Sequence, residues 1–321
     1  MKQAPTVAKA TKTSRKEEGT LYSTVMMGEQ KFLLLSGKDR FVNELPVPST
    51  FLGRGARGKV KQALKLNTTN EAPVAVKIFS KVNIKPAVQE AKILQTLGVP
   101  ICIGETDTKV YLFKNLEKGI TLKQFFDSLS APISSELEDP IFASKSCEQG
   151  IIIFKHLVNA LFGLHKKGVN HLDLHFANAL WDESTSTVTI IDFDRSREKV
   201  ALEPYDQMPL AFPTTYLPSL DLKDYLQDLI HICKHFKNTC LFEKSFKRKL
   251  LPNVEQVIQA LEDYLDGMIG NPGKLNYLPL RKEFTDKLDD LCLRIDACFQ
   301  EIESSSSIDF DSIDWPEVPR K

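Results

Sequence analysis

Two short segments in the middle of the chain carry oxygen-bearing side chains whose spacing suits chemistry on phosphates. The first reads His-Leu-Asp-Leu-His-Phe-Ala-Asn and contains Asp173 and Asn178, and the second reads Ile-Ile-Asp-Phe-Asp and contains Asp192. Short strands expected at 179–181 and 188–191 place the two segments on adjacent loops. Phosphoryl transfer needs a carboxylate near the incoming hydroxyl, and an amide and a carboxylate that hold Mg²⁺ against the phosphates. The pattern therefore indicates a site for phosphoryl transfer.

A glycine-rich stretch lies earlier in the chain and reads Gly-Arg-Gly-Ala-Arg-Gly-Lys-Val over residues 53–60. Glycines let the backbone approach a phosphate chain closely, where any Cβ would collide. An ordinary hairpin turn explains the stretch as well, if it is taken alone. A dinucleotide site of the Rossmann type is disfavoured, because neither a helix start nor a βαβ unit follows the glycines.

The next element, at residues 72–79, reads as a strand that carries one cation. Side chains alternate between the two faces of a strand, so Val74 and Val76 point into a core while Ala75 and Lys77 point the other way. A small residue beside an ammonium could cap an adenine ring and hold phosphate oxygens. A half-buried strand with a surface lysine is the blander alternative.

Glu90 lies in a predicted helix over residues 86–97, on the same face as Ala87 and Leu94. A carboxylate on an apolar face needs a cation, because an unpaired buried charge is costly. Lys77 is the natural partner. An exposed helical glutamate is the common alternative.

These parts, taken in order, resemble the protein-kinase superfamily over roughly residues 50 to 240. The resemblance implies an α+β, two-lobed protein-kinase-like fold with a small β-rich N-lobe and a larger helical C-lobe. It also implies an ATP-dependent phosphotransferase that uses Mg²⁺ or Mn²⁺. A Ser/Thr protein kinase that transfers the γ-phosphate of ATP to a protein hydroxyl is the first choice.

The resemblance also implies a role for each matching residue. Asp173 would orient or deprotonate the acceptor hydroxyl as the catalytic residue, and Asn178 and Asp192 would bind the metal ions. Adenine would meet the backbone near residues 114–116. The residues expected to bind ATP are Gly53, Gly55, Gly58, Val60, Ala75, Lys77, Glu90, Asn115 and Leu116.

Several positions depart from the kinase pattern. Leu172 stands where an arginine is common, so that position offers no cation to clamp a phosphate on an activation loop. His175 replaces a lysine, and Asp194 replaces a glycine; both changes resemble aminoglycoside, choline-type and lipopolysaccharide-core kinases. Residues 195–218 lack an Ala-Pro-Glu triplet and are rich in proline, so a docking groove for peptides is not implied.

Alternatives to a protein kinase follow from these departures. The first is a small-molecule or lipid kinase, and the second is a pseudokinase that serves as a binding scaffold or a related enzyme that transfers AMP. The compact core is also similar to effector kinases that intracellular bacteria deliver into host cells. That similarity implies secretion into the host-cell cytosol and association with membranes there.

The chain divides into four stretches. These are a disordered basic arm (1–20), an N-lobe with extra N-terminal strands (21–118), a C-lobe with a divergent helical C-terminal part (119–303) and an acidic Ser-rich tail (304–321). Apolar residues at three- and four-residue intervals predict helices at 154–164, 222–236 and 284–299. The resemblance to protein kinases implies that the second of these helices places Asp224 or Asp228 against the catalytic loop.

Composition narrows the class of protein. The 42 Lys and Arg residues balance 42 Asp and Glu residues, and no recognition motif appears, so binding to nucleic acid is not expected. Neither a transmembrane span nor a secretory signal is evident. Six scattered cysteines fit a reducing compartment, so the predicted location is cytoplasmic. Oligomeric state is not predicted.

A group of cations near three phenylalanines suggests a polyanion site. Its members are Lys234, Lys237, Lys244, Lys247, Arg248 and Lys249. They could bind an inositol polyphosphate as an activating cofactor, or a phosphoinositide head group at a membrane surface. A solvated helix face is the blander alternative. His231 and His235 have metal-binding spacing, but no second motif supports a metal there.

Overall fold

The computed structural model describes just over half of the chain. The described residues are 5–17, 20–36, 41–42, 45–46, 51–54, 57–66, 73–130, 140–199, 227–229, 231–232, 235 and 286. In the part of the chain described, no helix is long and apolar enough to cross a membrane.

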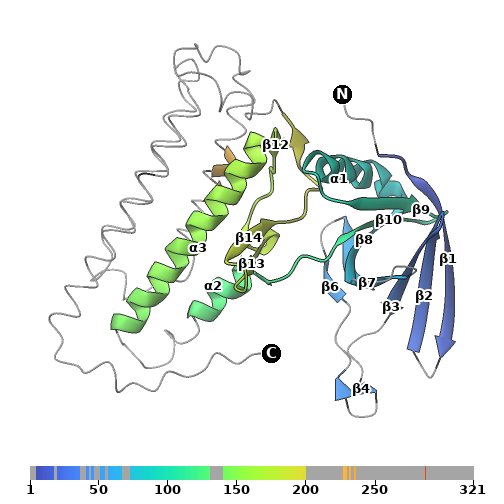
Figure 1. The fold of residues 1–321 in the computed structure, drawn as a ribbon, viewed down its shortest axis with the longest axis horizontal. Coiled ribbons are helices and arrows are strands. Elements are labelled where there is room, and N and C mark those ends of the chain that lie inside the picture. Colours follow the sequence, from blue (N-terminus) through green and yellow to red (C-terminus); the bar gives the residue numbers. More distant parts are fainter. Residues whose placement is uncertain are drawn as a thin grey trace.

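An eight-stranded sheet forms the first part of the molecule (Figure 1). Its strands are β1 (Ala8–Glu17), β2 (Thr20–Met27), β3 (Gln30–Ser36), β6 (Phe51–Arg54), β7 (Gly58–Leu66), β8 (Pro73–Ser80), β9 (Ile101–Glu105) and β10 (Lys109–Asn115). They follow the order β3-β2-β1-β9-β10-β8-β7-β6, and β3 also pairs with β7. This last pairing closes the sheet on itself and leaves β6 outside the ring. The short strands β4 (Phe41–Val42) and β5 (Leu45–Pro46) pair separately.

The prediction of a disordered arm over residues 1–20 is wrong for the stretch that forms β1. This strand pairs with β2 from Ala10 to Glu17 and runs parallel to β9 at its start. The basic residues Lys9 and Lys12 stay exposed while Ala10 is buried. Strand pairing satisfies the backbone without any need for apolar side chains at each position, so a charged segment can still form a strand.

The interior of the closed sheet is a small apolar core. Its buried residues are Ala10, Val25, Met27, Phe32, Leu34, Ala63, Val74, Val76, Tyr111 and Phe113. The rings of Phe32 and Phe113 stack with centroids 3.8 Å apart. Gly104 on β9 makes room for Met27, because a Cβ at that position would collide with the methionine side chain. The extra N-terminal strands therefore complete a core that β7, β8 and β10 only half enclose.

Helix α1 (Ile84–Thr96) follows the short turn η1 (Lys81–Asn83) and lies along β9 and β10 (Figure 1). It buries Ala87, Ala91, Ile93 and Leu94 on the outer face of the sheet. Glu90 is buried on this same face. The helix predicted over 86–97 is therefore confirmed, and so is the inward position of its glutamate.

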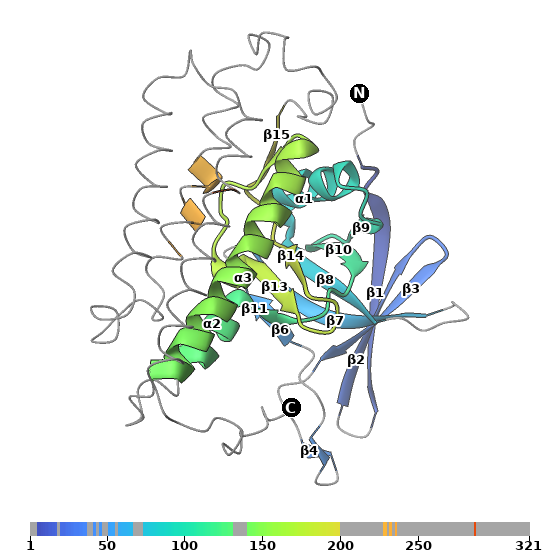
Figure 2. The same ribbon diagram turned by 60° about the vertical axis from the view of Figure 1, so that its left-hand side comes forward.

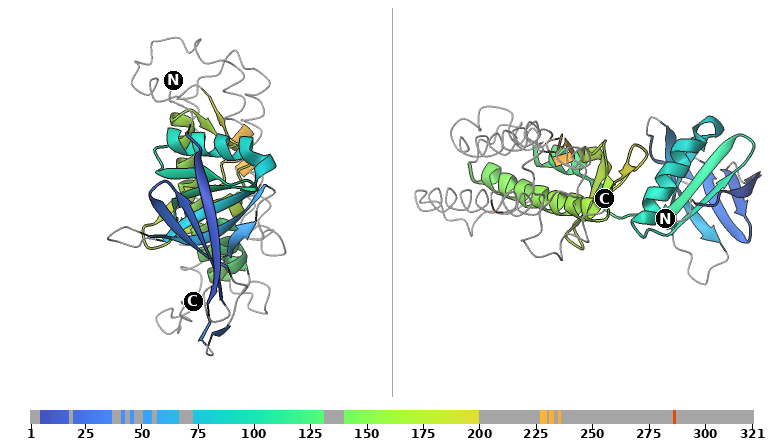
Figure 3. Two further views of the ribbon diagram at one scale, coloured as in Figure 1. Left: turned by 90° about the vertical axis from the view of Figure 1, so that its right-hand side faces the viewer. Right: turned by 90° about the horizontal axis from the view of Figure 1, so that it is seen from above.

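The second part of the molecule contains helices and small sheets. Its elements are β11 (Ile120–Thr121), α2 (Leu122–Ser130), α3 (Pro140–Lys166), β12 (Val169–Asn170), η3 (Phe176–Asn178), β13 (Ala179–Asp182), β14 (Thr187–Ile190) and β15 (Arg197–Glu198). The predicted helix at 154–164 is part of α3, which buries Phe154, Leu157 and Leu161 and packs against β14 (Figure 2). The right-hand view of Figure 3 shows α3 at one end of the described part of the molecule and β1, β2 and β3 at the other.

Much of the predicted helical C-lobe lies outside the described residues. This applies to the helix at 284–299, apart from Asp286 just inside it, and to the tail from residue 304. Of the stretch 222–236, residues 227–229, 231–232 and 235 are described and helical, with Leu229 and Ile232 fully buried. The lobe boundaries stay predictions.

Candidate active site

A cavity of about 730 Å³ lies between the outer face of the sheet and the loops that follow α3. Nine of the residues predicted from the sequence line it, namely Gly53, Val60, Ala75, Lys77, Glu90, Leu116, Asp173, Asn178 and Asp192. Gly58 and Asn115 lie nearby without lining the cavity, and Gly55 is outside the described residues. Residues more than a hundred positions apart are thus brought to one place.

The described residues of the glycine-rich stretch form the end of β6 and the start of β7. A Cβ on Gly58 would lie 2.8 Å from the backbone oxygen of Ile78, so this glycine allows β7 to approach β8. A Cβ on Gly53 would meet no protein atom within 4 Å. Because Gly53 lines the cavity and packing does not require a glycine there, the open space beside it suits a ligand such as a phosphate chain.

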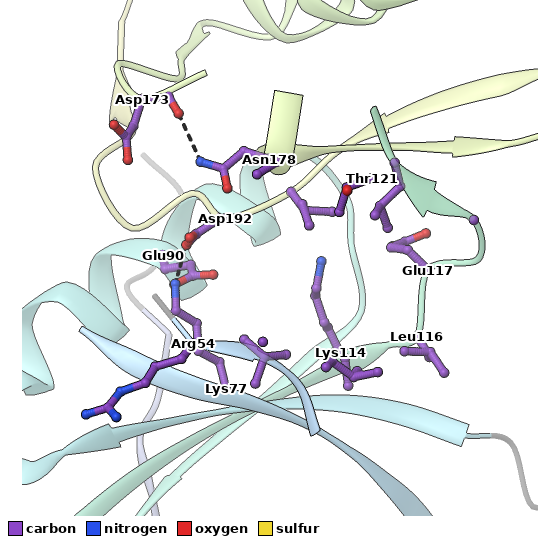
Figure 4. Close-up of a pocket in the computed structure, with 18 of the residues that line it drawn as sticks. Arg54, Lys77, Glu90, Lys114, Leu116, Glu117, Thr121, Asp173, Asn178 and Asp192 are labelled. Atoms are coloured by element: carbon purple, nitrogen blue, oxygen red, sulfur yellow. Dashed lines mark hydrogen bonds and ion pairs between the residues drawn. The ribbon is translucent and has the colours of Figure 1, made fainter. Parts of the chain in front are cut away.

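Strand β8 places Lys77 in the cavity. Val74 and Val76 are buried in the closed sheet while Ala75 and Lys77 line the cavity, which confirms the predicted alternation. The Lys77 Nζ lies 2.8 Å from Glu90 Oε2 and also forms an ion pair with Asp192 (Figure 4). Burial alone would lower the pKa of Lys77, but the Glu90 and Asp192 carboxylates outweigh it and raise the pKa. The lysine is therefore a fixed positive charge.

Asp194 is a third carboxylate beside this lysine, with Oδ2 3.6 Å from Lys77 Nζ. It is buried, with 7% of its side chain exposed. Arg57, from the glycine-rich stretch, donates a hydrogen bond from Nη1 to the backbone oxygen of Asp194 at 2.6 Å. The aspartate that departs from the kinase pattern therefore joins the metal motif to Arg57 of the glycine-rich stretch, which sequence reasoning did not foresee.

The loop 171–178 places Asp173 and Asn178 on the opposite wall of the cavity (Figure 4). Asn178 donates from Nδ2 to the backbone oxygen of Asp173 at 2.9 Å. The Asn178 oxygen is then the atom left to face a cation. Arg195 donates from Nη1 to Asp173 Oδ1 at 3.1 Å and lines the cavity. Sequence reasoning missed Arg195. Its position three residues after Asp192 could have indicated that it lies close to the site.

Asp228 supports this loop through two hydrogen bonds. Its two carboxylate oxygens accept hydrogen bonds from the backbone nitrogens of His171 at 2.8 Å and Leu172 at 2.9 Å. Leu172 has a φ of 61°, a left-handed conformation that is strained for leucine, so these bonds hold a costly turn in place. Of the two aspartates predicted for this role, Asp228 fills it and Asp224 lies outside the described residues.

Two buried histidines complete the support of the loop. Burial lowers the pKa of His165 and of His171, and the nearby Asp228 only partly opposes this. Both side chains are fully buried. The loop therefore rests on neutral imidazoles.

The donor set of the cavity suits a hard divalent cation. Mg²⁺ prefers oxygen ligands and commonly takes one or two carboxylates together with phosphate oxygens. Asp192 and the amide oxygen of Asn178 supply ligands of this kind on neighbouring segments of the wall. Among the described residues there is no cluster of three or more His, Cys, Asp or Glu side chains that could hold a metal ion without ligands from a phosphate.

The predicted polyanion site cannot be placed. All six of its residues, Lys234, Lys237, Lys244, Lys247, Arg248 and Lys249, lie outside the described residues. The rings of His231 and His235 lie 4.8 Å apart, and the His235 ring is 6.2 Å from that of His175 beside the cavity. These histidines belong to no metal cluster in the described structure.

Comparison with known proteins agrees with this geometry. Residues 48–211, just over half of the chain, match a family model described as protein kinase domain. A curated relative, CBL-interacting protein kinase 31 of Oryza sativa subsp. japonica, is 29% identical over 147 residues. The match covers 45% of this chain and 31% of the relative, which is less than two thirds of that protein's length.

Proposed function

The chain belongs to the protein kinase family of phosphotransferases, and we propose that it is catalytically active and transfers the γ-phosphate of ATP to a hydroxyl. One observation carries this proposal. Lys77, paired with Glu90 and Asp192, faces Asp173 and Asn178 across a single cavity. A binding scaffold without chemistry does not need this set, so the arrangement favours an enzyme over a pseudokinase.

Each residue has a defined part in the proposed reaction. Lys77 would hold phosphate oxygens, and Glu90 keeps the lysine in position. Asp192 and Asn178 would hold Mg²⁺, which when bound neutralises charge on the phosphates. Asp173 would orient the acceptor hydroxyl and take its proton.

Kinases commonly carry an arginine where this chain has Leu172 and a lysine where it has His175. Arg195 supplies a cation in their place. Its guanidinium bonds Asp173 with one of five N–H groups, so further donors are free to face a phosphoryl group. With 52% of its side chain exposed, it can also leave Asp173 when substrate binds. We propose that Arg195 both holds Asp173 and stabilises the transferred group.

We propose a Ser/Thr protein as the acceptor. The match to a protein kinase domain and the name of the plant relative support a protein substrate. His175 and Asp194 support the alternative of a small-molecule or lipid acceptor, because the residue types at these two positions resemble those of kinases that phosphorylate such acceptors.

Labelling can decide between these acceptors. The protein would be incubated with Mg²⁺ and ATP labelled at the γ-phosphate, once with a mixture of proteins and once with a metabolite extract. We expect label on protein serine or threonine. Label confined to small molecules would overturn the protein acceptor, and a product that gains the mass of AMP would replace phosphate transfer with AMP transfer.

Finer aspects of the proposal rest on sequence alone. These are the two-lobed division of the chain, delivery into a host cell by a bacterium, and activation by an inositol polyphosphate. A cytoplasmic location and binding to phosphoinositide membranes likewise stay predictions.

A further inference from the structure

Lys114 is a second lysine in the cavity, and the proposed function gives it no role. It lies near the end of β10, directly opposite Ala75 in the ladder with β8. Tyr111 and Phe113 point into the closed sheet, so the alternation of the strand puts Leu112 and Lys114 on the cavity side. Figure 4 shows the Lys114 side chain extending from the sheet into the cavity, apart from Lys77 and its carboxylates.

The two lysines differ in their partners. Lys77 has carboxylates of three residues within ion-pair distance. The Lys114 ammonium makes no hydrogen bond or ion pair with any residue that the structure describes. Burial lowers the pKa of Lys114, and Glu117 and Glu90 only partly oppose this. A half-buried ammonium of this kind gains free energy when a ligand brings an acceptor to it.

The position of Lys114 relates it to the base of a nucleotide, if the cavity binds one as proposed above. The phosphate-binding groups Lys77, Asn178 and Asp192 gather at one end. The region around Lys114 is lined by Ala75, Leu116 and Leu180, which suit the flat faces of a purine. Opposite residues on paired strands have Cβ atoms about 5 Å apart. A base that packs on Ala75 therefore has one edge within reach of the Lys114 side chain.

An ammonium only donates hydrogen bonds. Adenine carries an amino group at position 6, which also donates, whereas guanine carries an oxygen there, which accepts. Hypoxanthine carries the same oxygen. We propose that Lys114 makes the base end of the cavity favour purines with an oxygen at position 6, so that the chain binds GTP and ITP at least as tightly as ATP.

Calorimetry with the three triphosphates in the presence of Mg²⁺ tests this proposal. Lys114→Met keeps the length of the side chain and removes its donors. We expect it to weaken the binding of GTP and ITP about tenfold relative to ATP, the size of a hydrogen bond to a charged group. ITP is included because, unlike GTP, it has no amino group at position 2.

Two further variants sharpen the test. Lys109→Met makes the same change on the same strand at an exposed position, and we expect the ratio of the dissociation constants for ATP and ITP to stay as in wild type. Lys114→Gln offers both a donor and an acceptor, so its ratio should lie between those of wild type and Lys114→Met.

The outcomes separate this inference from the proposed function. If all three triphosphates bind and the ratio for ATP and ITP is the same in wild type and Lys114→Met, the inference is wrong and the proposed function stands. If wild type binds none of them, both fail. A thermal melt of each variant shows that it is folded before its binding is compared.

Discussion

An Asp173→Ala variant is expected to transfer phosphate about 10²–10⁴ times more slowly than wild type, while its affinity for ATP changes little. The carboxylate lines the cavity and is 28% exposed, so it can reach an acceptor hydroxyl. It also lies on the wall opposite Lys77, the residue that would hold phosphate oxygens. Its loss should therefore lower kcat far more than it raises the KM for ATP.

Asp107→Ala is the matched control for this variant. Asp107 lies exposed in the turn between β9 and β10, away from the cavity. Steady-state rates of the three proteins, with a direct binding measurement for ATP, complete the comparison. If Asp173→Ala were as fast as Asp107→Ala, Asp173 would have no catalytic role.

The second large effect is expected on stability. Lys77→Met leaves Glu90 buried without its cation, and breaking a buried ion pair in this way costs about 3–5 kcal/mol of the free energy of unfolding. Asp194, with 7% of its side chain exposed, loses its nearest cation as well. We expect a lower midpoint in urea denaturation and no detectable phosphate transfer.

A double variant separates stability from chemistry. Lys77→Met with Glu90→Leu replaces the pair by apolar side chains, so the stability lost through the unpaired Glu90 should return while transfer stays absent. Lys81→Met is the surface comparison, because its partner Glu105 and Lys81 itself are 32% and 39% exposed and such pairs contribute about 0–1 kcal/mol. A double variant as unstable as Lys77→Met would show that the pair does not carry the stability assigned to it.

The parts of the site that follow local rules could be predicted from the sequence. Alternation along β8 put Ala75 and Lys77 on one face, and the apolar stripe of α1 turned Glu90 toward them. Asp173 and Asn178 were found because the chemistry of phosphates restricts the side chains that can serve it.

Features that depend on tertiary contacts were missed. Strand β1 forms because β2 and β9 offer it partners, and nothing in its own basic sequence indicates them. Arg195 matters because the fold places it beside Asp173, and Asp194 matters because the fold places it beside Lys77. Lys114 likewise belongs to no motif. Its position matters only because β10 faces a cavity.

The most direct test of the central claim is transfer of label from γ-labelled ATP in the presence of Mg²⁺, measured for wild type and Asp192→Ala side by side. Asp192 is the residue that bonds Lys77 and lies on the segment next to Asn178, so its removal should abolish the site for the metal ion without opening the fold. We predict label on the acceptor with wild type and background counts with a folded Asp192→Ala protein. Equal labelling by the two proteins would contradict the assignment of this cavity as the active site.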